Sequence, residues 1–149
     1  MVNNPPTLAG FQNFVSNYMN IPASALPVGA PAVSFAFQIA ADLVNPVLNC
    51  VSPDLFTLAT YNLAGSNLIE YAPDQTGQTY FADLRAAFKI NSFAPGLVNS
   101  TSDNGTSTAM ALPKFTENLS LSDLQLLKNP WGRRYLEIAS KFGPLWGVS

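Results

Sequence analysis

Residues 52–71 read SPDLFTLATYNLAGSNLIEY. Ser52 is a favoured helix N-cap, and Pro53 is favoured at the first helical position. Asp54 places an acidic side chain in the first turn, where it interacts favourably with the helix dipole. The stretch therefore predicts a long helix that begins at Pro53 and ends near Tyr71.

This predicted helix is apolar on more than one side. Its main stripe consists of Leu55, Leu58, Ala59, Leu63 and Leu68. Outside that stripe lie four more apolar side chains: Phe56, Tyr61, Ala64 and Ile69. A helix of this kind either occupies the centre of its bundle or is covered by a neighbouring chain.

Cap residues and apolar spacing predict three more helices within the first 90 residues. Thr7 is suited to cap a helix that ends near Asn20, and Pro31 is suited to open a second one. The second helix extends to about residue 44, and Pro46 ends or kinks it. After the turn at residues 74–77, a further helix is expected over about 78–88.

Two helices are predicted near the C-terminus. Ser120 or Ser122 is suited to cap a short helix through residue 127, with Ser122 and Gln125 at capping-box spacing. Asn129 and Pro130 open the second helix, in which apolar side chains recur at helical spacing to about residue 142. Gly143 then occupies the position of a left-handed C-terminal cap.

Between these regions, residues 93–112 have a different composition. Asn104-Gly105 between two short runs is a strong signal for a β-hairpin. The runs are rich in Ser and Thr and only weakly apolar, and an isolated hairpin is marginal in water. We therefore expect either a hairpin that packs on something outside its own domain or a loop without regular structure.

A length of 149 residues predicts a single domain. The fold class is mainly α: a compact four- to five-helix bundle with an extended β-hairpin or loop arm and a C-terminal helix and tail. Within that domain, residues 1–90 form the helical bundle, residues 91–117 the arm, and residues 118–149 the C-terminal helix and tail.

The composition argues against most enzyme classes. The chain has no histidine, so Ser-His-Asp and Cys-His arrangements and histidine-containing metal sites are impossible. It has one cysteine, Cys50, which is expected to be a small buried hydrophobe. A Gly-Lys-Ser/Thr phosphate loop is also absent. We therefore expect no catalysis, no cofactor and no metal ion.

Targeting and membrane segments are not predicted. The N-terminus lacks the basic and apolar regions of a signal peptide. The first 41 residues carry no charge, but prolines and polar residues interrupt them too often for a membrane span. The expectation is a soluble protein without membrane association. The lack of paired cysteines is typical of folding in a reducing cytoplasm.

The few charges are distributed unevenly. Charged residues make up 11% of the chain, against about 25% in an average soluble domain. Residues 1–84 contain five acidic and no basic side chains, whereas residues 85–149 contain seven basic and four acidic ones. This asymmetry is either chance or the basis of a head-to-tail contact between copies.

A basic and aromatic cluster near the C-terminus is the main candidate site. Lys128, Arg133, Arg134 and Lys141 lie close in sequence to two Trp and one Tyr, a composition typical of interface hot spots. Two alternatives remain: aromatic side chains in the core with solvated arginines, or contact with nucleic acid. The candidate interface residues are Trp131, Arg133, Arg134, Tyr135, Trp146, Val98, Asn104 and Met110.

Three parts of the sequence resemble the head–tail adaptor (connector or neck) proteins of tailed bacteriophages. The first is the pattern over 37–68, with Ala40-Ala41 and Asn45-Pro46 before a helix that contains Asn67-Leu68. The second is the Ser/Thr-rich segment over 100–108. The third is the Pro-Trp-Gly-Arg opening over 130–133.

The resemblance implies a structural virion protein in the neck between head and tail. Such a protein is assembled in the host cytoplasm as a ring of twelve copies. It would join the portal protein to a tail or neck protein and let DNA pass through its lumen during genome ejection, without specific binding. Alternatives are another neck or tail-completion ring protein, or a small helical binding module unrelated to phages.

Overall fold

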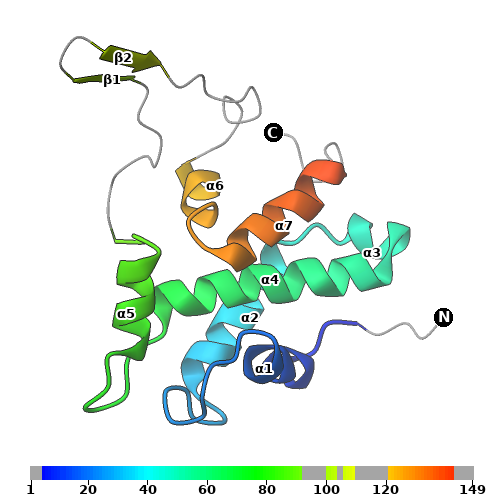
Figure 1. The fold of residues 1–149 in the computed structure, drawn as a ribbon. Helices are drawn as coiled ribbons and strands as arrows, with labels where there is room; N and C mark the ends of the chain where they lie inside the picture. Colours follow the sequence, from blue (N-terminus) through cyan, green and yellow to red (C-terminus); the bar gives the residue numbers. More distant parts are fainter. Residues whose placement is uncertain (1–4, 92–99, 104–105, 110–120, 143–149) are drawn as a thin grey trace.

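The computed structural model describes residues 5–91, 100–103, 106–109 and 121–142. Within these ranges the chain is mainly helical, which confirms the predicted mainly α class. Figure 1 shows the order of the elements. The helices are α1 (Leu8–Asn17), α2 (Pro31–Leu43), α3 (Val47–Val51), α4 (Pro53–Tyr71), α5 (Tyr80–Ala87), α6 (Leu121–Leu126) and α7 (Pro130–Lys141), and the strands are β1 (Ser100–Asp103) and β2 (Thr106–Ala109).

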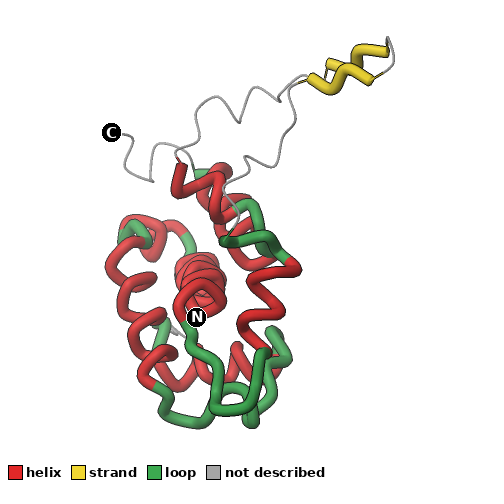
Figure 2. The backbone as a smooth tube through the Cα atoms, turned by 90° about the vertical axis from the view of Figure 1, so that its left-hand side faces the viewer, coloured by secondary structure: helices red, strands yellow, loops and turns green. Residues whose placement is uncertain are grey.

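The long helix α4 is the centre of the helical part. Figure 2 looks along α4 and shows other helices on both sides of it. Residues 59–69 of α4 are buried apart from Tyr61, which is half-buried. Helices α1, α2, α3, α5 and α7 all contact α4. The apolar side chains outside the main stripe of α4 are therefore explained by its central position.

Small side chains let the neighbouring elements approach α4 closely. Ala59, Ala64 and Gly65 are fully buried or nearly so. A Cβ atom added to Gly65 would lie 3.0 Å from the Met19 Sδ atom and 3.5 Å from the Trp131 Cγ atom. This side of α4 thus has room for two large neighbours only because residue 65 has no side chain.

The predicted starts of α1, α2 and α4 are confirmed. The Thr7 Oγ1 atom accepts a hydrogen bond from the Gly10 backbone N–H at 3.0 Å. The Ser52 Oγ atom accepts one from the Leu55 N–H at 3.4 Å. Pro31 is the first residue of α2, as expected.

The short helix α3 was not predicted. The sequence indicated only that Pro46 ends or kinks the preceding helix. In the structure Pro46 is the N-cap of α3, and the Asn45 Oδ1 atom accepts a hydrogen bond from the Val47 N–H at 2.9 Å. The expectation for Cys50 was wrong as well: its side chain is exposed, because α3 turns only Leu48 into the core.

Aromatic side chains form much of the core between α1, α2 and α4. Phe11 is fully buried, and its ring centroid lies 6.4 Å from that of Phe14, 6.0 Å from that of Phe37 and 6.1 Å from that of Tyr61. The Tyr61 hydroxyl also accepts a hydrogen bond from the backbone N–H of Thr7 at 3.2 Å. The N-terminal helix is thereby joined to the central one.

Helix α5 covers the C-terminal end of α4. Both carboxylate oxygens of Asp74 accept backbone hydrogen bonds at the start of α5, from Phe81 and Ala82. The Arg85 guanidinium donates to the carbonyl oxygens of Ile69 at 3.1 Å and Ala72 at 2.8 Å. These bonds satisfy carbonyl groups that the last turn of a helix leaves without partners.

The capping box predicted for Ser122 and Gln125 is wrong. Helix α6 begins at Leu121, so Ser122 lies inside the helix. Gln125 instead donates a hydrogen bond from its Nε2 atom to the Ile90 carbonyl at 3.0 Å. Ser120, the other proposed cap, and Gly143 lie outside the described residues.

The strands β1 and β2 pair with each other in antiparallel register. Ser100 is opposite Ala109, and Asp103 is opposite Thr106. Figure 2 draws the two strands apart from the helices. Most of the predicted arm over 91–117 lies outside the described residues.

Candidate protein interface

Four of the eight candidate interface residues lie in the described part of the chain, and all four belong to α7. They are Trp131, Arg133, Arg134 and Tyr135. The other four, Val98, Asn104, Met110 and Trp146, lie outside the described residues. The structure therefore locates the C-terminal part of the predicted interface on one helix.

The start of α7 is fixed to the central helix by one buried side chain. Asn129 is fully buried. Its Oδ1 atom accepts a hydrogen bond from the Gly132 N–H at 2.7 Å, and its Nδ2 atom donates to the Ser66 Oγ atom at 2.9 Å. One amide thus caps α7 and joins it to α4, and both bonds are shielded from water.

Gly132 has no room for a side chain. A Cβ atom at this position would overlap the backbone carbonyl group of Leu126. Gly132→Ala is therefore expected to destabilise the protein by about 1–3 kcal/mol, because backbone atoms cannot move aside as a flexible side chain can. Chemical denaturation measures this loss. Ala139→Gly is a useful comparison in the same helix: it costs only about 1 kcal/mol through helix propensity.

Trp131 packs against its own chain. Its side chain is half-buried, and its ring lies edge-on to Phe88, with centroids 6.3 Å apart and an interplanar angle of 85°. The Trp131 side chain also lies close to Gly65 of α4. Trp131 therefore joins α7 to α4 and to the end of α5.

Tyr135 also lies on the inner side of α7. Its side chain is half-buried and packs against the core. Burial and the nearby carboxylate of Asp123 raise the pKa of Tyr135 to about 12, because both disfavour a charged phenolate. Trp131 and Tyr135 are thus half-buried and pack against the core, which agrees in part with the alternative that placed them in the core.

The arginines point the other way. Arg133 and Arg134 are exposed, as is Lys141 about two turns further on. Arg133 donates to the Leu127 carbonyl at 3.3 Å, and Arg134 forms an ion pair with Glu137 at 3.0 Å. We refer to Arg133, Arg134 and Lys141 as the α7 basic face.

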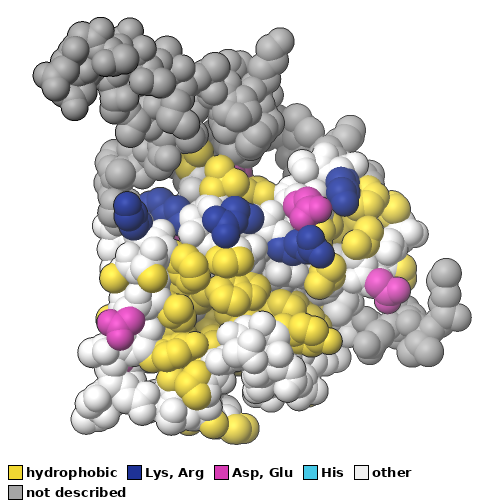
Figure 3. All heavy atoms as spheres, viewed as in Figure 1, with side chains coloured by type: hydrophobic (Ala, Val, Ile, Leu, Met, Phe, Trp, Pro, Cys, Tyr) yellow, Lys and Arg dark blue, Asp and Glu magenta, His cyan; other side chains and the backbone are white. Residues whose placement is uncertain are grey.

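The electrostatics of this face follow from its composition. Glu137 is the only acidic side chain within α7, and it pairs with Arg134 and, at 3.6 Å, with Lys141. The hydrogen bond and the charge of Arg134 hold the pKa of Glu137 below its ordinary value. Figure 3 shows basic side chains in a row across this side of the molecule, above a band of hydrophobic ones. The face therefore stays positive at neutral pH.

A polar cluster at the base of α6 was not found from the sequence. Glu70, in the last turn of α4, is half-buried, and burial raises the pKa of its carboxyl group. A hydrogen bond from Gln125 and the charge of Lys128 act in the opposite direction. The cluster connects α4 with the segment that leads into α7. Its residues lie too far apart in sequence for any local pattern to show it.

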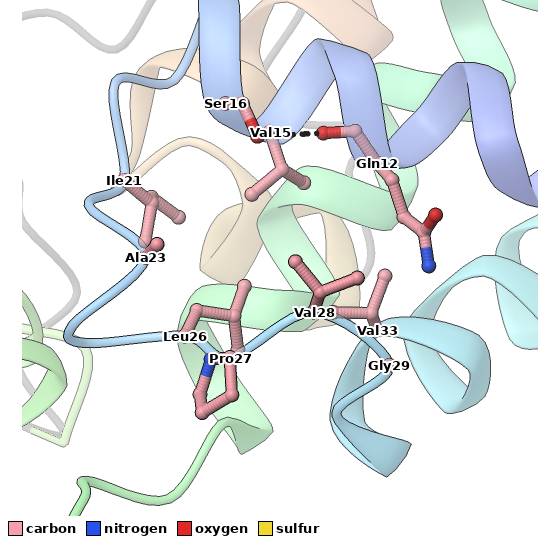
Figure 4. Close-up of a pocket in the computed structure, with 10 residues that line it drawn as sticks. All are labelled: Gln12, Val15, Ser16, Ile21, Ala23, Leu26, Pro27, Val28, Gly29 and Val33. Carbon is pink, nitrogen blue, oxygen red and sulfur yellow. Dashed lines mark hydrogen bonds between the residues drawn. The ribbon is translucent and has the colours of Figure 1, made fainter.

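A small pocket lies between α1 and the loop that precedes α2. Its volume is about 70 Å³, and Figure 4 shows Val15 and Val28 facing each other across it. Ligand pockets usually measure about 300–1,000 Å³. This pocket has room for a few atoms only, and its lining is mostly apolar.

Among the described residues, no three His, Cys, Asp or Glu side chains are grouped as metal ligands. None of the helices in the described ranges combines the length and apolar character needed to cross a membrane. Neither a family model, nor a curated protein, nor a solved structure matches the chain.

Proposed function

We propose that this chain is a structural virion protein that forms an adaptor ring between the portal and the tail of a tailed bacteriophage. The observation that carries the proposal is the α7 basic face. It presents three exposed cations on a helix whose other side is fixed to the core by Asn129 and Trp131. A rigid, charged helix of this kind is suited to bind another chain.

The resemblance to head–tail adaptor proteins supplies the rest of the proposal. The helices form a compact bundle, and the segment that contains β1 and β2 is an arm that contacts a neighbouring copy or partner. The ring has twelve copies and binds the portal protein on one side and a tail or neck protein on the other. It lies in the virion neck after assembly in the host cytoplasm.

In this proposal the chain performs no catalysis and binds no cofactor. DNA passes through the lumen without specific binding. The net charge of −2 supports this, because attraction to DNA requires a clear excess of positive charge. A lumen that does not retain DNA is suited to the passage of the genome.

The test is the double variant Arg133→Ala with Arg134→Ala. Both side chains are exposed, so the free energy of unfolding of the isolated subunit should change by no more than about ±0.5 kcal/mol, as is typical of surface substitutions. The melting temperature should therefore change little. Ring closure or docking to the portal should weaken, as measured by native mass spectrometry of the full chain.

A matched control is Asn13→Ala with Gln38→Ala, at two exposed helix positions of α1 and α2. It should leave both stability and assembly unchanged. Unchanged assembly of the arginine variant would show that the α7 basic face is solvated. A chain that remains monomeric at all concentrations would favour the alternative, a small helical binding module.

A further inference from the structure

The corner around α3 exposes apolar side chains. Leu43, Val47 and Val51 are exposed at 63%, 46% and 54%, respectively. They come from the end of α2 and from α3, so they lie close together in sequence and at the same turn of the chain (Figure 1). Asp42 and Asp54 flank them and are also exposed. We call these five residues the α3 corner.

The α3 corner is acidic as well as apolar. No Lys or Arg occurs anywhere in residues 1–84, so both of its carboxylates lack a basic neighbour in sequence. Clustered apolar side chains with a charged rim are typical of protein contacts. The charge of this corner favours a partner surface that is positive.

The α7 basic face has the matching properties. It is positive, it is exposed, and its helix is fixed to α4. The two surfaces are formed by different elements, because α7 carries the basic one, whereas α2, α3 and the first turn of α4 carry the acidic one. One chain therefore has two patches of opposite charge.

We propose that the α3 corner of one copy contacts the α7 basic face of the next copy. This inference rests on the proposed ring and names the two surfaces that form it. A contact between two different patches is heterologous, and repeated contacts of this kind close into a ring when the rotation between copies permits. Asp42 and Asp54 then face Arg133, Arg134 and Lys141, and the valines of α3 are covered.

The single cysteine of the chain provides a direct test, because Cys50 lies in α3 and is exposed. Wild-type protein is mixed with the variant Glu137→Cys, Cys50→Ser and treated with a short bifunctional thiol crosslinker. Glu137 is an exposed residue of α7, and its replacement keeps all three cations of the α7 basic face but removes the carboxylate that pairs with Arg134 and Lys141. The expected product is a dimer that contains one chain of each kind.

The control variant carries the cysteine at another exposed position instead of position 137. The variant Ser24→Cys, Cys50→Ser places the thiol in the loop between α1 and α2, and it should give at least about fivefold less mixed dimer. Crosslinking of wild type to itself through Cys50 would indicate a symmetric contact and overturn the inference. Equal yields with Ser24→Cys would overturn it as well.

A second variant tests the apolar part of the contact. Val47→Ser with Val51→Ser should weaken self-association by about tenfold or more in native mass spectrometry. Val28→Ser changes a valine that is 92% exposed in the loop before α2, and it should have no effect on self-association. If oligomers form but neither test gives the expected result, the contact between the α3 corner and the α7 basic face is refuted, while the proposed ring is not. If no oligomer forms under any condition, the proposed ring fails as well.

Discussion

Asn129→Ala is expected to lower the free energy of unfolding by about 2–4 kcal/mol. The substitution removes an N-cap, which typically costs about 0.5–2 kcal/mol. It also leaves the buried Ser66 hydroxyl without the donor that it had, at a further cost of about 1–3 kcal/mol. Urea denaturation of the full chain measures the total.

Two comparisons separate these contributions. Asn129→Ser keeps a good N-cap but is too short to replace the amide bond to Ser66, so its loss should lie between zero and that of Asn129→Ala. Asn13→Ala makes the same change at an exposed position and should cost about 0.5 kcal/mol at most. A loss for Asn129→Ala as small as that for Asn13→Ala would contradict the buried bond.

Phe11→Ala is expected to have the largest effect on stability, a loss of about 3–5 kcal/mol. Phe11 is fully buried among the rings of Phe14, Phe37 and Tyr61, and its removal leaves a cavity that those rings fill only in part. Thermal and chemical denaturation both measure the loss.

Phe35→Ala is the matched control for Phe11→Ala. Phe35 is 51% exposed and contacts Tyr71 edge-to-face, with ring centroids 6.0 Å apart. Its removal from the isolated subunit should cost about 1 kcal/mol or less. Similar losses for both variants would show that Phe11 is not part of a well-packed core.

Helix starts could be predicted from the sequence because capping is local chemistry. Thr7, Ser52 and Asn129 each bond to a backbone N–H three residues further on, so the partner is fixed by the spacing alone. The short helix α3 could not be predicted in this way. Its five residues contain too few turns for an apolar period, and its burial depends on contacts with α4.

The candidate site was predicted only in part, for a related reason. The sequence indicated the cluster of Arg133, Arg134 and Tyr135, but not which side of α7 faces the core. That side is fixed by contacts with α4, among them the hydrogen bond between Asn129 and Ser66, which lies 63 residues earlier. The acidic and apolar character of the α3 corner was hidden as well, because Asp42 and Asp54 belong to different helices.

The long separation between Ser66 and Asn129 also affects how the chain is made. A ribosome adds about 5–20 residues per second, so Asn129 is synthesised about 3–13 s after Ser66. During that interval α4 lacks the cover that Trp131 and the rest of α7 provide. A nascent chain is therefore exposed to aggregation or chaperone binding at this surface until α7 has been synthesised.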